Sequence, residues 1–341
     1  MSAGGGVFVW GWWQGADVEA RRVCDSAAAA PVAGGFGFGG VLDGGRLRVL
    51  GNRTGYVAAD AEVDNVVTAA CGFEHALCAA SDDDGTRLLG WGWNAHAAAA
   101  PGTAQAEVAA PSLALRTPHA VLKLACGEQH SLALLVDGAL LSWGAGSCGQ
   151  LGHGGRGDGA APQRVRLPCG ASDVAAGARH SLAVCAGEAF SWGWGLYGQL
   201  ATGGNEDVLA PAVVAALRGV AVASVAAGLQ HSAFLTSAGD VYAAGANADG
   251  QLGLGGDEEV ALSPQLVEGV EGVAAASCGA RHSVFLTAAG DLYATGWNAH
   301  GQLCSGDRAS RRAPTRVLGA VRAASAGWWH TLVSVVPPAL S

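Results

Sequence analysis

The sequence is short of charge, and of positive charge above all. Only 14% of its 341 residues are charged, Lys123 is the only lysine, and the formal net charge is -9. No stretch has more than two consecutive basic residues. Nucleic acids and anionic membranes are bound chiefly through clustered Lys and Arg, so we expect no nucleic-acid partner. The acidic balance favours protein partners instead.

Long apolar runs are also missing. The N-terminal residues "MSAGGGVFVWGWWQG" lack the basic region and extended apolar stretch of a signal peptide. No segment reaches the roughly 18 uninterrupted apolar residues that a membrane-spanning helix needs. We therefore expect no membrane insertion and a cytoplasmic or nuclear location.

The nine cysteines form no C-x-x-C pair, so neither a disulfide framework nor a zinc ribbon is indicated. Cys71, Cys126 and Cys278 each precede the glycine of a repeated motif that has alanine at this position in other copies. We interpret these three cysteines as fillers of a small buried slot, and we expect no metal site.

Glycine, in contrast, is abundant, with 54 residues, which indicates many tight turns between short strands. Within residues 191–200, "SWGWGLYGQL", Gly193, Gly195 and Gly198 match the G-x-G-x-x-G fingerprint of dinucleotide-binding folds. That fingerprint requires a helix after the glycines, and no helical apolar period follows here. The same spacing recurs in residues 144–149, which indicates that these glycines have a structural role in a repeated unit, and we expect no cofactor.

Two half-motifs recur along the chain. One is a glycine followed by two variable residues, His and a small residue, with the histidines at His75, His130, His180, His231, His282 and His330 and a degraded copy at Gly37. The other is an apolar strand ending in glycine, at Gly11, Gly51, Gly92, Gly144, Gly193, Gly245 and Gly296. A strand, a turn and another strand fit between the two halves, as in "SAFLTSAGDVYAAG".

The whole unit repeats about every 51 residues, the distance from Gly245 to Gly296. Several strands per unit at this period predict a β-propeller, because one small sheet cannot cover its own apolar faces. One pair of half-motifs is longer than the rest, and its extra residues coincide with "SDDDG" at 81–85, which we interpret as an acidic hairpin insertion.

The two ends of the sequence carry complementary halves. The chain begins with a W-G half that has no preceding histidine half, and it ends with "GWWHTLVSVV", which has no following W-G half. We therefore expect residues 7–12 to pair with residues 331–336 and close the ring, which removes exposed sheet edges.

These motifs, best seen in "GANADGQLG" and "GWNAHGQLC", resemble the RCC1 (regulator of chromosome condensation) repeat family. The resemblance implies an all-β, seven-bladed propeller as a single domain over residues 1–336, followed by a short tail at 337–341. The blades over about 20–120 match less well, because "WNAHAAAAPG" and "GNRTGYVAAD" lack the G-Q-L segment, so we expect irregular blades there.

The recurring histidines could suggest an acid–base or metal cluster. Because they recur once per blade they lie around a ring, whereas catalytic groups must converge. We expect each to be hydrogen-bonded within its own blade, and we expect no catalytic residues. The protein should therefore not be an enzyme.

Tryptophans fall into two groups. Trp10, Trp143 and Trp192 precede the motif glycine and should pack between blades. The second group follows the glycine or occupies the variable slot of the histidine motif, and should gather on one face as a partner-binding surface: Trp12, Trp93, Trp194, Trp297 and Trp328. The alternative is that the glycine-rich loops bury these rings locally.

Members of the family differ in activity, so the resemblance leaves function open. We favour a non-enzymatic protein-interaction scaffold. One alternative is a guanine-nucleotide exchange factor, with a small GTPase as partner. Another is the ultraviolet-B photoreceptor class, which is similar in its G-W-x-H-T motif but uses several adjacent copies, whereas only Trp328 fills that slot here. The equivalent positions hold Phe73, Glu128, Ala178, Leu229 and Ala280.

Overall fold

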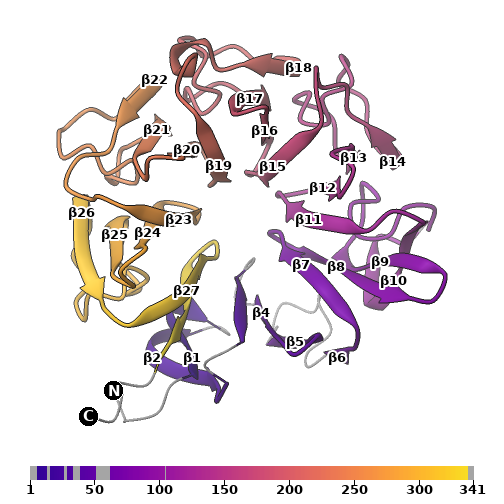
Figure 1. The fold of residues 1–341 in the computed structure, drawn as a ribbon, viewed down its shortest axis with the longest axis horizontal. Helices are drawn as coiled ribbons and strands as arrows, with labels where there is room; N and C mark the ends of the chain where they lie inside the picture. The colour runs from indigo at the N-terminus through magenta and orange to yellow at the C-terminus, as the bar shows by residue number, and fades with distance from the viewer. Residues whose placement is uncertain are drawn as a thin grey trace.

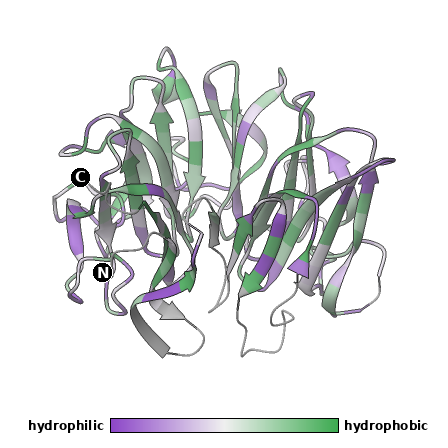
Figure 2. Cartoon of the chain, turned by 60° about the horizontal axis from the view of Figure 1, so that its bottom comes forward, coloured by the Kyte–Doolittle hydropathy of each residue, from purple (hydrophilic) through white to green (hydrophobic). Residues whose placement is uncertain are grey.

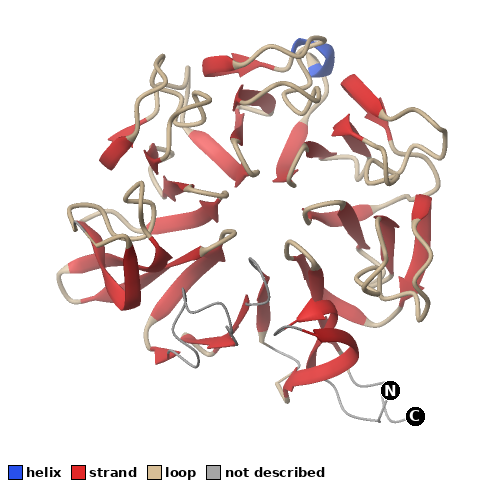
Figure 3. Ribbon diagram, turned by 180° about the vertical axis from the view of Figure 1, so that it is seen from behind, coloured by secondary structure: helices blue, strands red, loops and turns tan. Residues whose placement is uncertain are grey.

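The computed structural model describes residues 6–13, 16–26, 29–33, 39–50, 62–103 and 105–336, with the backbone alone at 12–13, 16–19, 31–33 and 50. This described part is almost entirely β, with 28 strands in seven four-stranded antiparallel sheets. Its one helical element is the short 3-10 turn η1 (Ala215–Leu217), drawn blue in Figure 3. Among the described residues, no helix has the length and apolar character needed to cross a membrane.

The sheets are the seven blades of a propeller, arranged in a ring (Figure 1). Blade 1 comprises β3 (Ala30–Ala33), β4 (Gly39–Asp43), β5 (Arg46–Leu50) and β6 (Glu62–Val63). Blade 2 comprises β7 (Val66–Cys71), β8 (His75–Asp82), β9 (Gly85–Trp93) and β10 (Glu107–Thr117). Blade 3 comprises β11 (Val121–Cys126), β12 (His130–Leu135), β13 (Leu140–Gly144) and β14 (Gly159–Arg164). Blades 4 and 5 comprise β15 (Ala171–Ala176), β16 (His180–Cys185), β17 (Glu188–Gly193) and β18 (Val208–Val213); and β19 (Val222–Ala227), β20 (His231–Thr236), β21 (Val241–Ala246) and β22 (Val260–Leu266). Blade 6 comprises β23 (Val273–Cys278), β24 (His282–Thr287), β25 (Leu292–Gly296) and β26 (Arg311–Leu318), and blade 7 comprises β27 (Val321–Ala326), β28 (His330–Val335), β1 (Gly6–Trp13) and β2 (Ala16–Cys24).

Blade 7 joins the two ends of the chain. Strand β1 pairs antiparallel with β28, in a register that runs from Gly6 opposite Val335 to Gly11 opposite His330. The expected closure by the N-terminal strand is therefore confirmed, with the paired segments starting one residue earlier than predicted. The division into a domain at 1–336 and a tail at 337–341 stays a prediction, because the tail lies outside the described residues.

The core lies between neighbouring blades, because each sheet turns its apolar faces toward the sheets on either side. Trp143 of blade 3 is fully buried and packs with Leu77 of blade 2, and Trp192 of blade 4 packs with Leu132 of blade 3. Trp10 packs against blade 6 in the same way. Many strands in Figure 2 are accordingly largely green, the colour that marks hydrophobic residues. The prediction that these tryptophans pack between blades is confirmed.

The acidic segment at 81–85 extends the hairpin of blade 2. Strands β8 and β9 stay paired as far as Asp82 opposite Gly85, so the extra residues lengthen both strands by continuing their ladder. The Asp82 carboxylate lies 2.9 Å from Nε of Arg87 and 3.1 Å from an Nη of Arg116. The inserted hairpin is thus tied to β10 by charge.

Blade 1 has the shortest strands among the described residues. Its β3 has four residues and its β6 has two. The degraded histidine motif starts at Gly37, and its first two residues lie outside the described residues, as does the segment 51–61.

Candidate interaction face and central channel

Two kinds of loop emerge on the same face of the ring. In blade 3, His130 pairs with Gly144 at one end of β12 and β13, so the turn before the histidine and the loop after the glycine leave the sheet together. His180 and Gly193 do the same in blade 4. We call this side the histidine-turn face; the hairpin at 81–85 and the connections between blades lie on the opposite face.

The loops after the W-G strands of blades 3, 4 and 5 are fastened to the following blade. Backbone N–H groups of Gly154, Gly203 and Gly255 each donate to a carbonyl of the next blade's outermost strand, at 2.9, 2.9 and 2.8 Å. Within the loop, the buried Gln199 side chain accepts from the backbone N–H of Tyr197 at 2.9 Å. The G-Q-L segment is therefore a structural clasp between blades.

The fingerprint glycines are explained by the same packing. Gly144 has a φ of +102°, and a Cβ there would lie 2.6 Å from the Gln129 carbonyl oxygen. A Cβ at Gly146 would collide with the Gly157 carbonyl oxygen, and one at Gly149 would lie 2.9 Å from the Leu209 Cα. These glycines permit close backbone contacts, and turns and a further strand follow them in place of a helix.

Five of the six motif histidines do not bond within their own blades, so that prediction was wrong for them. The Nε2 atom of each of these five imidazoles instead lies 2.9 to 3.0 Å from a hydroxyl on the next blade, in the pairs His75–Ser131, His130–Ser181, His180–Ser232, His231–Ser283 and His282–Thr331. The physical reason is orientation, because side chains of a blade project from the sheet toward its neighbours. The motif glycine makes room for this, since a Cβ at Gly127 would collide with the His130 ring.

The hydroxyl partners fix the proton on these rings. Ser181 donates its hydroxyl to the Gln150 carbonyl at 2.9 Å, so the same oxygen must accept a hydrogen bond from His130 Nε2–H. Burial lowers the pKa of His130 and of His180 to about 3 and that of His75 to about 4. The imidazoles are neutral donors in a ring of interblade contacts, which is a structural role.

Four of the five candidate tryptophans lie on the histidine-turn face with half-buried side chains: Trp93, Trp194, Trp297 and Trp328. The Trp194 ring lies 5.4 Å from that of Tyr197, centroid to centroid, and the Arg179 guanidinium lies 6.0 Å from its centre. The Trp297 ring lies 5.2 Å from that of Trp329. Each ring thus has another aromatic side chain against it and stays partly exposed.

The other two post-glycine tryptophans differ in what the structure describes. Trp93 is half-buried at the end of β9. Trp12 belongs to β1, but its side chain lies outside the described residues. Trp93, Trp194 and Trp297 lie at the ends of strands in three different blades, as a repeat with one such position per blade requires.

Trp328 is directed toward the centre of the ring. It belongs to blade 7, yet its ring lies 4.4 Å from that of Phe73 in blade 2, so the pair bridges the position of blade 1. From the sequence, Phe73 was identified only as a counterpart of Trp328 in the variable slot. Both residues occupy the variable slot of the histidine motif, and residues in that slot converge on the central axis of the ring. This shared slot could have indicated that the two rings meet.

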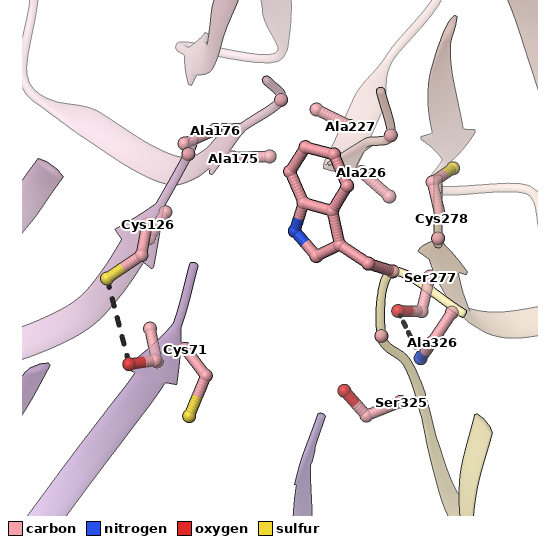
Figure 4. A pocket seen from close by; sticks show the side chains of 18 of the residues that line it. Cys71, Cys126, Ala175, Ala176, Ala226, Ala227, Ser277, Cys278, Ser325 and Ala326 are labelled. Atoms are coloured by element: carbon pink, nitrogen blue, oxygen red, sulfur yellow. Dashed lines mark hydrogen bonds between the residues drawn. The ribbon is translucent and has the colours of Figure 1, made fainter. Parts of the chain in front are cut away.

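Below this pair lies a cavity of about 260 Å³, lined by the innermost strands of blades 2 to 7 (Figure 4). Cys71, Cys126 and Cys278 border it, as do the alanines at equivalent positions. Burial raises the pKa of Cys71 and Cys278 to about 12, so both thiols stay protonated. Among the described residues no cluster of three metal-ligating side chains occurs.

The innermost strands of blades 3, 4 and 5 are linked through one charged pair. Lys123 Nζ of blade 3 lies 2.6 Å from a carboxylate oxygen of Asp173 in blade 4. The other carboxylate oxygen accepts from the Val225 backbone N–H of blade 5 at 3.0 Å. The chain's single lysine is therefore used to hold blades together.

Known proteins resemble this chain in both sequence and fold. The Ultraviolet-B receptor UVR8 of Arabidopsis thaliana is 37% identical over 236 residues, which are 66% of this chain and 52% of that protein. The probable E3 ubiquitin-protein ligase HERC3 of Homo sapiens is 35% identical over 64% of this chain and 21% of its own length. The chain thus spans about half or less of the curated relatives it matches.

Solved structures show the same architecture. Human WBSCR16 superposes with a TM-score of 0.82 at 23% identity, covering 97% of this chain and 98% of that one. Prp20p of Saccharomyces cerevisiae gives a TM-score of 0.82 at 18% identity, covering 100% and 93%. The model of the RCC1-like domain matches residues 39–333. With seven blades, interblade histidines and this match, the chain belongs to the RCC1-like domain family.

Proposed function

We propose that the protein is a non-enzymatic interaction module that binds a protein partner on its histidine-turn face. The observation that carries this proposal is the placement of Trp194, Trp297 and Trp328, half-buried on one face, each beside a second aromatic ring. Tryptophans that are held in place but incompletely covered are typical of binding hot spots, because little side-chain entropy is lost on association.

The charges around these rings support a specific orientation for the partner. Arg179 of blade 4 lies 2.8 Å from Glu128 of blade 3, and Arg281 of blade 6 lies 3.3 Å from Asp249 of blade 5. These pairs are partly exposed and cross between blades. Polar groups that ring an aromatic centre match the usual anatomy of a protein interface.

The test uses a partner identified by crosslinking in the native source and then purified. Its affinity is measured calorimetrically for Trp194→Ala, Trp297→Ala and a control, Leu122→Ala. Leu122 is 53% exposed at the start of β11, on the opposite face. Each tryptophan variant should weaken binding by roughly 2 kcal/mol, and the control should bind normally.

If the double variant Trp194→Ala/Trp297→Ala folds and binds normally, the interface lies on another surface. The hairpin at 81–85 is then the next surface to test. A double variant that unfolds would show that the rings belong to the core. If the captured partner is a small GTPase, the release of its bound nucleotide with and without the propeller distinguishes an exchange factor from a scaffold.

A further inference from the structure

One disulfide occurs among the nine cysteines, all of which lie in the described residues. Cys169 is bonded to Cys185, with their Cα atoms 5.9 Å apart, a normal separation for such a bond. The other seven cysteines are free thiols. The cysteine spacing predicted no disulfide framework, and this single bond was not expected because the two residues share no spacing motif.

The two sulfur-bearing residues differ in access. Cys185 is the last residue of β16 and is 1% exposed. Cys169 is exposed, in the connection between β14 and β15 that leads from blade 3 to blade 4. A thiol arriving from solvent therefore reaches the sulfur of Cys169 first, and Cys185 is the leaving group.

Beside Cys169 lies a cavity of about 470 Å³ with two arginines in its wall, Arg164 and Arg166. Both are exposed, and neither forms an ion pair with any residue that the structure describes. Between them Val165 is buried, with its backbone N–H donating to the Leu140 carbonyl at 2.8 Å. This anchor fixes the backbone between the two arginines, which line the same cavity as Cys169.

Five of the seven free thiols, all except Cys24 and Cys148, are poor competitors for exchange. Burial raises the pKa of Cys78 to about 12 and that of Cys126 and Cys304 well above the usual value, as it does for Cys71 and Cys278. Thiolate is the reactive form, so these groups react slowly. The exposed end of the Cys169–Cys185 bond is the accessible sulfur that also has unpaired cations beside it.

We propose that the Cys169–Cys185 bond is a reversible modification site for a small anionic thiol of the glutathione class, whose carboxylates are bound by Arg164 and Arg166. The incoming thiolate attacks Sγ of Cys169, a new S–S bond forms there, and the Cys169–Cys185 bond breaks. Cys185 leaves as a thiolate and takes a proton from water. A second small thiolate then attacks the sulfur of the small molecule that is bonded to Cys169. This step gives the oxidised small-molecule disulfide and releases the Cys169 thiolate, which is protonated by water. The two small thiols have then passed two electrons to the protein.

The test compares an anionic thiol with a neutral one on the full chain. Nonreducing peptide mapping first establishes the Cys169–Cys185 bond. Glutathione and 2-mercaptoethanol are then added separately, and the mixed disulfide at Cys169 is followed by mass spectrometry for the unmodified protein, for Arg164→Gln/Arg166→Gln and for a control, Arg218→Gln. Arg218 is exposed and directly follows η1, in the connection from blade 4 to blade 5.

The double variant should react with glutathione about tenfold more slowly while its reaction with 2-mercaptoethanol stays within about twofold, because only the anionic thiol interacts with the arginines. High salt should remove the difference, and Arg218→Gln should behave like the unmodified protein. Absence of the Cys169–Cys185 bond, equal slowing with both thiols, or glutathione found on other cysteines while Cys169 is unmodified would each overturn the proposal. Thermal melting of each variant verifies that all are folded.

Discussion

The Nε2 atom of His180 lies 2.9 Å from the hydroxyl oxygen of Ser232, although the two residues belong to different blades. Ser232 donates its own proton to the Gln199 carbonyl at 2.7 Å, and Gln199 belongs to the loop after the W-G strand of His180's blade. A histidine turn, a strand of the next blade and a G-Q-L loop thus form one hydrogen-bonded unit that repeats around the ring.

Removing one histidine should weaken this unit measurably. His180→Ala is expected to lower the free energy of unfolding by about 1–3 kcal/mol, because Ser232 loses its buried donor. Chemical denaturation of His180→Ala, Ser232→Ala and the double variant measures the coupling between the two side chains. Additive losses would show that the hydrogen bond contributes nothing, and loss of a measured turnover without loss of stability would contradict the non-enzymatic interpretation.

Stability should fall as the solution becomes acidic. The pKa of His180 and that of His282 are about 3 in the folded protein, well below the value of 6.5 for an unperturbed histidine. Below pH 6.5 the histidines of the unfolded chain therefore bind protons, whereas those of the folded chain stay neutral. Their contribution to the free energy of unfolding is fully present above this pH and is lost as the pH decreases toward 3. At full slope each such histidine contributes about 1.4 kcal/mol per pH unit.

Denaturation midpoints between pH 7.5 and pH 5 measure this effect. His180→Gln carries one titrating group fewer, so its stability should depend less steeply on pH than that of the unmodified protein. A pH-independent midpoint for both proteins would contradict the neutral, buried state of the histidines.

The closing strand should stabilise the whole ring. Deleting residues 1–13 removes β1, in which Val7 and Val9 are fully buried, at about 2 kcal/mol for each large buried side chain lost. The milder Val9→Ala keeps the strand and should cost about 1–2 kcal/mol. A truncated protein that melts at the same temperature as the full chain would contradict the role of β1 in closure.

The fingerprint glycines offer a matched pair of substitutions. Gly144→Ala places a Cβ against the Gln129 carbonyl at a φ of +102° and should cost at least about 1–3 kcal/mol. Gly155→Ala, in the same loop, meets no atom within 4 Å and should be nearly neutral. Equal melting temperatures for the two variants would show that the loop adapts and that its glycines are not required for packing.

The repeat determined how much could be predicted from the sequence. Constant spacing between the histidine and W-G halves predicted the blades, and the unmatched halves at the ends predicted the pairing of β1 with β28. A period assigns a residue to a position within its unit, but it does not say whether the side chain contacts its own blade or the next. For this reason the histidine partners were predicted incorrectly and the Trp328–Phe73 contact was missed.

Contacts that occur once in the ring could not be predicted from the repeat at all. The Cys169–Cys185 bond joins a blade connection to the end of β16, and no other blade has a counterpart. The Lys123–Asp173 pair is likewise a single event, which depends on two residues that occupy the same strand position in neighbouring blades. Both follow from the distance between segments that the sequence separates by 16 and 50 residues.

The antiparallel pairing of β1 with β28 has a mechanical consequence. Gly6 and Val335 lie opposite each other at the same end of the ladder, and the remaining pairs follow in order to Gly11 and His330. A force that pulls these two ends apart would load one pair of the ladder at a time, as in opening a zipper, and would never shear all six together. The seam on which closure of the ring depends is therefore its weakest point under tension, so a molecule stretched between its ends should open at blade 7 while the other six sheets are still intact.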